Sequence, residues 1–186
     1  ETLSGGGWVS RGGGPRDGWL AGPRLFALAR VAEPAPGLRR AALPHMRWLR
    51  DMTGETIHLM APDGGEMVLI ERLDSTQPLR TVRQLGGRVP LHVASNGKAV
   101  LAALPAAEQE GYLAAPLFPS SRLSITDPER LREVLAEVRA CGFAVSRGEL
   151  DDGINAVAAA ILRPDGRPVG SLSISSPAGT VELVRS

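Results

Sequence analysis

The chain has very few residues of the types that form covalent or metal-bound cross-links. Its 186 residues include one cysteine, Cys141, and three histidines, His45, His58 and His92. A single cysteine excludes an internal disulfide, and the three histidines lack the spacing of metal ligands. We therefore expect no disulfide framework, no metal site and no bound cofactor.

Long apolar runs are also missing. No stretch is long enough for a signal sequence or a membrane span, so we expect a cytoplasmic protein without a membrane partner. The hydrophobic content of 43% is nevertheless enough to fill a core. The sequence opens at Glu1 without an initiator methionine, and we expect part of the protein to precede it.

Signatures of catalysis and of nucleotide binding are absent too. No G-x-S-x-G pattern is present. The pair Gly97-Lys98 does not belong to a phosphate-binding P-loop, because His92 and Ala99 stand where that loop needs a glycine and a Ser or Thr. We therefore expect no catalytic residue and no bound nucleoside triphosphate.

One acidic loop keeps an enzymatic alternative open. Glu149, Asp151 and Asp152 lie close together between two predicted strands. They could contact a ligand or act as general bases. A solvated loop is the simpler interpretation, and it is the one that we favour.

The charge is unevenly distributed. The chain has 21 basic and 20 acidic residues, a net charge of +1, but residues 1–50 hold eight arginines against three acidic residues. The remaining residues hold thirteen basic and seventeen acidic side chains. A basic head joined to an acidic body predicts two parts with different partners.

Glycine dominates the head. Eight of the 22 glycines lie between positions 5 and 22, where two short apolar runs, residues 8–10 and 19–21, flank a glycine-rich turn. This pattern predicts a two-stranded hairpin with Arg11 and Arg16 at its tip, which suits a nucleic-acid backbone. A flexible linker is the alternative, and this stretch alone does not decide between the two.

Helices, and then strands mixed with helices, are predicted after the head. A helix over residues 23–31, a proline-rich break and a helix over residues 38–52, kinked at Pro44, look like a connector. In the body, predicted strands come first and last with helices between them. This order predicts an antiparallel sheet with helices packed on it. Its expected strands are 55–60, 67–70, 79–83, 143–146, 154–162 and 168–176, and its expected helices are 95–104, 106–113 and 126–141, the last with a capping box of Thr126 and Glu129.

Two features of the body predict a polar pocket. Alternation places Ser171, Ser173 and Ser175 on one face of the last strand, beside a neighbouring strand of small residues that leave space above the sheet. The helix that begins at Ser95-Asn96-Gly97 presents free backbone N–H groups, which suit a carboxylate or phosphate. A solvent-exposed serine face is the alternative.

Several segments, in order along the chain, resemble the IclR-type family of bacterial transcription regulators. Each segment is weak alone, but their order and spacing make the resemblance specific. The segments are residues 20–25, 53–59, 86–92, 97–102, 139–145, 149–153 and 157–159.

This resemblance implies an α+β fold with two domains. Residues 1–22 would be the wing of a truncated winged helix-turn-helix domain, residues 23–36 a linker helix, and residues 37–186 an effector-binding domain with a GAF-like or profilin-like antiparallel sheet. The helix that reads DNA would lie before Glu1. Family members form homodimers, which often pair into tetramers as dimers of dimers.

The resemblance also implies where a ligand binds. The family's ligand pocket falls on the predicted helix start at Ser95 and on the serine-bearing face of the last strand. Val89 would add an apolar wall. Thr81 and Ser146 also fall at this pocket, but they depart from the apolar and acidic residues that the family has there. The other implied positions are Ser95, Asn96, Gly97, Val89, Ile154, Ala156, Ser173 and Ser175.

We therefore expect a transcription regulator, a repressor or dual regulator, whose C-terminal domain binds a small organic acid. Its head would bind operator DNA, with Arg11 and Arg16 on the phosphates. The alternatives are an enzyme that acts on a small carboxylate through residues 149–152 and a stand-alone sensor that never binds DNA.

Overall fold

The computed structural model of the chain describes residues 3–12, 18–25, 37–77 and 83–179. It separates into two units, Glu1–Gly37 and Leu38–Ser186. In the first unit, β1 (Val9–Arg11) pairs antiparallel with β2 (Trp19–Ala21), with Arg11 opposite Trp19. The predicted hairpin is thus present, and the interpretation of residues 8–10 and 19–21 as a flexible linker is wrong.

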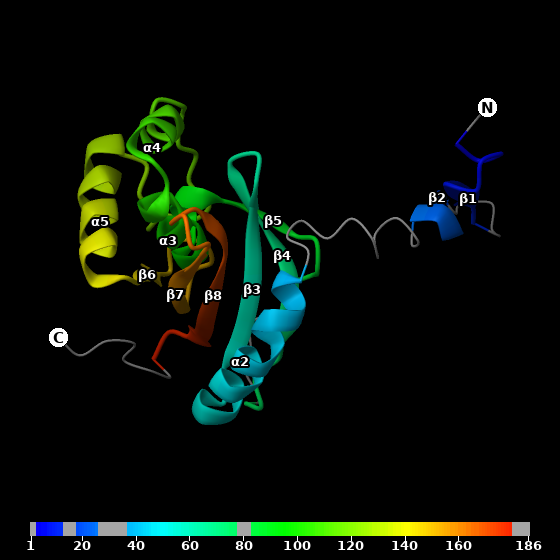
Figure 1. Ribbon diagram of the computed structural model, residues 1–186, viewed down its shortest axis with the longest axis horizontal. Helices are drawn as coiled ribbons and strands as arrows, with labels where there is room; N and C mark the ends of the chain where they lie inside the picture. Colours follow the sequence, from blue (N-terminus) through cyan, green and yellow to red (C-terminus); the bar gives the residue numbers. More distant parts are fainter. Residues whose placement is uncertain (1–2, 13–17, 26–36, 78–82, 180–186) are drawn as a thin grey trace. The chain divides into compact units, whose positions relative to one another are not determined.

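The second unit is built on a six-stranded antiparallel sheet with the strand order β5-β4-β3-β8-β7-β6. The central position of β8 beside β3 brings this last strand next to the first hairpin of the unit. Figure 1 shows this as the red-brown β8 lying between β7 and the teal β3. The strand bounds are β3 Thr56–Asp63, β4 Glu66–Leu73, β5 Arg88–Pro90, β6 Ala144–Arg147, β7 Ile154–Leu162 and β8 Pro168–Pro177.

Helices cover both faces of this sheet. α2 (Leu38–Thr53) contacts β3, β4 and β8, and it buries Leu38, Ala42 and Met46, which share one side of the helix. α3 (Ser95–Ala103) contacts β7 and β8 on the opposite face and packs in turn on α5 (Pro128–Cys141). Figure 1 shows α2 on one side of the sheet, with α3, α4 (Ala106–Leu113) and α5 on the other.

The hydrophobic core lies between the sheet and α3. Nearly every residue of α3 is buried, because the helix is enclosed by strands on one side and by α5 on the other. Small side chains on β7 let α3 approach the sheet closely. The core includes Met60, Met67, Leu69, Val89, Leu91, Val100, Leu101, Leu131, Leu135, Ala144 and Ala158.

Two local predictions need correction. The N-cap of α5 is Asp127, whose carboxylate accepts the backbone N–H of Glu129 at 3.0 Å, so Thr126 does not form the expected capping box. The reason is that Pro128 occupies the first helical turn, which proline favours. The strand at one edge of the sheet is Arg88–Pro90, which the sequence did not predict. Of the strand predicted at 79–83, residues 79–82 lie outside the described part, and Arg83 lies outside any strand.

Candidate ligand-binding site

A cavity of about 400 Å³ opens between the start of α3 and the sheet. Small-molecule sites commonly have volumes of a few hundred cubic ångströms and a few convergent polar groups. Strands β3, β6, β7 and β8 contribute to the wall, together with α3 and the β6–β7 loop. The lining residues are His58, Met60, Arg83, Ala94, Ser95, Asn96, Ser146, Leu150, Asp151, Ile154, Ala156 and Ser175.

The first turn of α3 supplies the polar end of the cavity. Ser95 is 1% exposed, and its Oγ has no hydrogen-bond partner among the described residues. Asn96 is anchored, because its Nδ2 donates to Ser171 Oγ at 2.9 Å. Backbone N–H groups in a first helical turn lack an acceptor within the helix, so this end is suited to an anion.

Gly97 has a different role from the one expected. It does not line the cavity; a Cβ at this position would lie 2.1 Å from the carbonyl oxygen of Leu91. Such a distance is far below any normal contact, so only glycine lets α3 start directly against the 3₁₀ turn η1 (Leu91–Val93). The lack of a side chain at Gly97 thus positions the helix start, and its backbone N–H belongs to the same first turn as those of Ser95 and Asn96.

The serine row of β8 is buried, so the solvent-exposed alternative is wrong. Ser171, Ser173 and Ser175 all have exposed fractions of 6% or less. Ser171 accepts from Asn96, and Ser175 lines the cavity. Ser173 does not line it, and its buried Oγ has no partner among the described residues.

His58 is one of the lining residues that sequence reasoning missed, together with Met60, Arg83, Ala94 and Leu150. It lies on β3 opposite Ser173, with its Nδ1 3.3 Å from Ser175 Oγ and its Nε2 without a partner among the described residues. Burial, reinforced by the charges of Arg83 and Arg72, lowers the pKa of His58 to about 4. The imidazole is therefore neutral at pH 7.

Arg83 and Asp151 form an ion pair at the cavity wall. The guanidinium Nη2 of Arg83 lies 2.5 Å from Asp151 Oδ2, and the two side chains are 27% and 55% exposed. Arg72 also donates from Nη1 to the carbonyl oxygen of Arg83. These contacts hold a cation where an anionic ligand would meet it.

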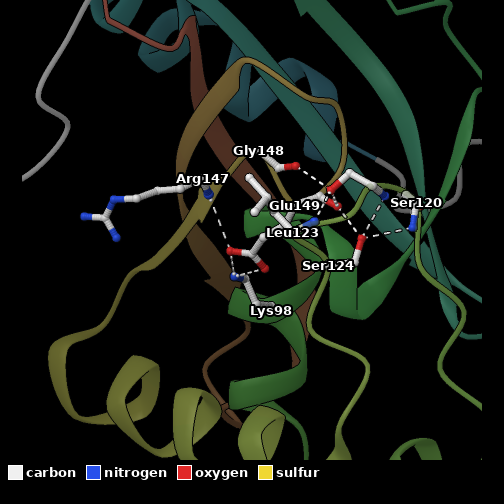
Figure 2. Close-up of polar contacts among 8 residues, drawn as sticks. Lys98, Ser120, Leu123, Ser124, Arg147, Gly148 and Glu149 are labelled. Carbon is white, nitrogen blue, oxygen red and sulfur yellow. Dashed lines mark hydrogen bonds and ion pairs between the residues drawn. The ribbon is translucent and has the colours of Figure 1, made fainter.

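A second ion pair, buried behind the cavity wall, fixes the loop between β6 and β7. Lys98 Nζ lies 2.6 Å from both carboxylate oxygens of Glu149, and Lys98 is 1% exposed (Figure 2). Glu149 is thus not the solvated residue that we expected, because Lys98 from α3 pairs with it. Ser124 Oγ also donates to the Glu149 carbonyl oxygen at 2.6 Å. This network holds the loop that carries Leu150 and Asp151.

The other predicted positions divide between the cavity and the core. Ser146, Ile154 and Ala156 line the cavity, as do Ser95, Asn96 and Ser175. Val89 does not line it: it is buried in the core, because β5 pairs with β4 and places it opposite Met67. Thr81 lies outside the described residues.

The hairpin of the first unit presents cationic and aromatic side chains together. Arg11 lies with its guanidinium carbon 5.3 Å from the ring centroid of Trp19, and Arg24 is placed similarly over Trp8 at 5.9 Å. Arg11, Trp19 and Leu20 are exposed. Arg16 lies outside the described residues.

Two absences within the described part of the chain bear on the remaining expectations. Among residues 3–12, 18–25, 37–77 and 83–179, no three His, Cys, Asp or Glu side chains gather as a metal site would require. Within the same ranges, no helix is both long and apolar enough to cross a membrane.

Comparison with known proteins identifies the family. The profile described as "Bacterial transcriptional regulator IclR C-terminal" matches residues 35–184. The HTH-type transcriptional repressor AllR of Klebsiella pneumoniae is 37% identical over 136 residues, which are 73% of this chain and 50% of AllR. The probable transcriptional regulator SauR of Cupriavidus necator is 34% identical over 155 residues, 83% of this chain and 61% of SauR. The chain thus spans between half and about three fifths of these relatives.

A solved structure agrees with the sequence matches. An IclR homologue from Microbacterium hydrocarbonoxydans, complexed with 4-hydroxybenzoate, superposes with a TM-score of 0.84 at 28% identity, covering 96% of this chain and 73% of that one. The family and these relatives are transcriptional regulators and not enzymes. The chain belongs to the IclR family of bacterial transcriptional regulators.

Proposed function

We propose that residues 37–186 are the effector-binding domain of a transcription regulator, and that a small organic anion occupies the cavity at the start of α3. The observation that carries this proposal is a pair of unpartnered buried polar atoms, Ser95 Oγ and His58 Nε2, on residues that line one cavity. Buried polar atoms are nearly always hydrogen-bonded, and each one left unpaired costs about 1–3 kcal/mol. A polar ligand would supply the missing partners.

The charge of the cavity favours an anion. The first turn of α3 brings positive potential to the cavity, and the guanidinium of Arg83, which is paired with Asp151, lies at its wall. The volume of about 400 Å³ suits a small carboxylic acid. The 4-hydroxybenzoate complex of the Microbacterium relative supports the same class of ligand for this chain.

The regulatory part of the proposal concerns DNA. Residues 1–22 would be the wing of a DNA-binding domain and residues 23–36 a linker, and the protein would act as a homodimer or a dimer of dimers. A repressor role is supported by the relative AllR, which is an HTH-type transcriptional repressor. Effector binding changes DNA affinity only if the effector prefers one arrangement of the DNA-binding domains over another.

Calorimetric titration with acetate, succinate, benzoate and 4-hydroxybenzoate tests the cavity. We expect at least one acid to bind, and the Ser95→Ala/Ser175→Ala variant to bind it about 100-fold more weakly. The reason is that two hydrogen bonds to a charged group contribute about 1.5 kcal/mol or more each. Ser120→Ala, at an exposed serine away from the cavity, is the matched control. Unchanged affinity in the double variant, or no binding of any acid, contradicts the proposal.

Salt dependence tests the wing. In a protein extended upstream to include the rest of the DNA-binding domain, Arg11→Ala/Arg16→Ala should reduce the slope of log affinity against log salt by about 2. Each phosphate contact contributes about 0.9 to that slope, whatever the base sequence. The slope is measured by fluorescence anisotropy with operator DNA. An identical slope contradicts the wing assignment, and an extended protein without DNA affinity favours a stand-alone sensor.

A further inference from the structure

The imidazole of His58 stands apart from the other polar groups of the cavity because it can change its charge. It is 7% exposed and lines the cavity from β3, the strand next to β8. Ser175 Oγ contacts Nδ1, while Nε2 has no partner among the described residues. One ring nitrogen is therefore anchored and the other is free for a ligand.

We propose that His58 contacts the effector and takes up one proton when an organic anion enters the cavity. This inference rests on the proposed function, because it requires an anionic effector in that cavity. The bound carboxylate would then lie against a cationic imidazole as well as against Arg83. His58 would thereby favour an acid over an uncharged ligand of the same shape.

The charged groups around His58 explain why the proton is absent before binding. Arg72 from β4 and Arg83 from the segment before β5 disfavour a third positive charge, and Asp74 offsets them only in part. Arg72 and Asp74 are paired at 2.6 Å, as Arg83 and Asp151 are at 2.5 Å. The carboxylates of Asp74 and Asp151 are thus each already paired with an arginine.

The remaining faces of the imidazole are uncharged. The side chains of Ser173 and Ser175 from β8 and of Ser95 and Asn96 from α3 carry no charge. Entry of an anion would add a negative charge that is not already paired with an arginine. An opposite charge within a few ångströms favours the protonated form, so the pKa of His58 rises on binding.

The sign of the pH dependence follows from this rise. With the cavity empty, the pKa of His58 is about 4, and with the anion bound it is higher. Between those two values the complex holds one more proton than the free protein. Affinity therefore increases about tenfold for each pH unit that the pH falls within that window, and it is independent of pH above the window.

Calorimetry in buffers of different ionisation enthalpy measures the proton directly. With the tightest-binding acid of the panel, between about pH 5 and 7.5, we expect proton uptake that increases as the pH falls. His58→Gln keeps a hydrogen-bonding group but cannot titrate, so uptake and the rise in affinity should disappear. His45→Gln, at an exposed histidine on α2, is the matched control and should behave as the wild type.

A second measurement does not depend on a variant. The ring carbon signals of His58, followed by NMR, should report a neutral imidazole over this pH range without acid and a protonated one in the complex at the lower pH. Binding without proton uptake, or uptake that persists in His58→Gln, overturns this inference and leaves the proposed function intact. No binding by any acid overturns the proposed function and this inference with it.

Discussion

Replacing Lys98 with methionine should lower the free energy of unfolding by about 3–5 kcal/mol, because the substitution leaves the carboxylate of Glu149 buried without its cation. Both Glu149 oxygens lie 2.6 Å from Lys98 Nζ, and the two side chains are 1% and 11% exposed. Urea unfolding measured by circular dichroism gives this difference. A loss below about 1 kcal/mol would contradict a buried, paired Glu149.

Two further variants separate loss of the pair from loss of packing. Burial lowers the pKa of Lys98, and Glu149 opposes that effect. Desolvation of two buried charges costs free energy that a packed apolar pair does not incur. We therefore expect Lys98→Met/Glu149→Leu to recover most of the lost stability. Arg132→Met, which breaks exposed ion pairs with Glu110 and Glu129, should leave the unfolding midpoint nearly unchanged.

Gly97→Ala should have the next largest effect, a loss of about 3 kcal/mol, at the upper end of the range for overpacking a core. The added Cβ would lie 2.1 Å from the carbonyl oxygen and 2.4 Å from the Cα of Leu91. Both neighbours are backbone atoms, so α3 and the η1 turn must separate. Since Ser95 and Asn96 move with the start of α3, acid binding should weaken in the same variant.

The control for Gly97→Ala lies on the next helix. A Cβ added at Gly111, in α4, would have open space around it, with no neighbouring atom within 4 Å among the described residues. Gly111→Ala should therefore be neutral or stabilising, by up to about 1 kcal/mol. Thermal unfolding and calorimetric titration of both variants make the comparison. Equal stability of the two variants would contradict the close approach of α3 to Leu91.

Sequence reasoning was accurate where local pattern determines structure. The sequence predicted a helix over residues 126–141, and α5 runs over Pro128–Cys141 with Leu131, Leu135 and Val138 buried in the core. Alternation along residues 168–176 predicted β8 and placed its serines on one face. Glycine and proline turns separated these elements at nearly the observed residues.

The same reasoning failed where residues far apart in the chain meet. His58 reaches the cavity only because β3 pairs with β8, a contact between positions 117 residues apart. Lys98 and Glu149 are separated by 51 residues, and neither one alone indicates its partner. The side chain of Val89 lies in the core because β5 pairs with β4, which the local sequence did not indicate. Local periodicity carries no information about such pairings.

The candidate site was predictable in its chemistry but not in its full composition. A helix start beside a serine-bearing strand indicated an anion pocket, and six of the predicted positions line one cavity. The positive charge of Arg83 and the imidazole of His58 became visible only with the fold. They add a titratable imidazole and an arginine, paired with Asp151, to the anion pocket that the sequence predicted.

The most direct test of the central claim is to map a bound acid by NMR. In ¹⁵N–¹H spectra of the chain titrated with the acid that binds most tightly in calorimetry, the largest shifts should fall on the amides of Ser95, Asn96 and Gly97. His58 and Ser175 should shift next, because they line the same cavity. Large shifts confined to other surfaces, with the amides of Ser95 to Gly97 unchanged, would contradict an anion site at the start of α3.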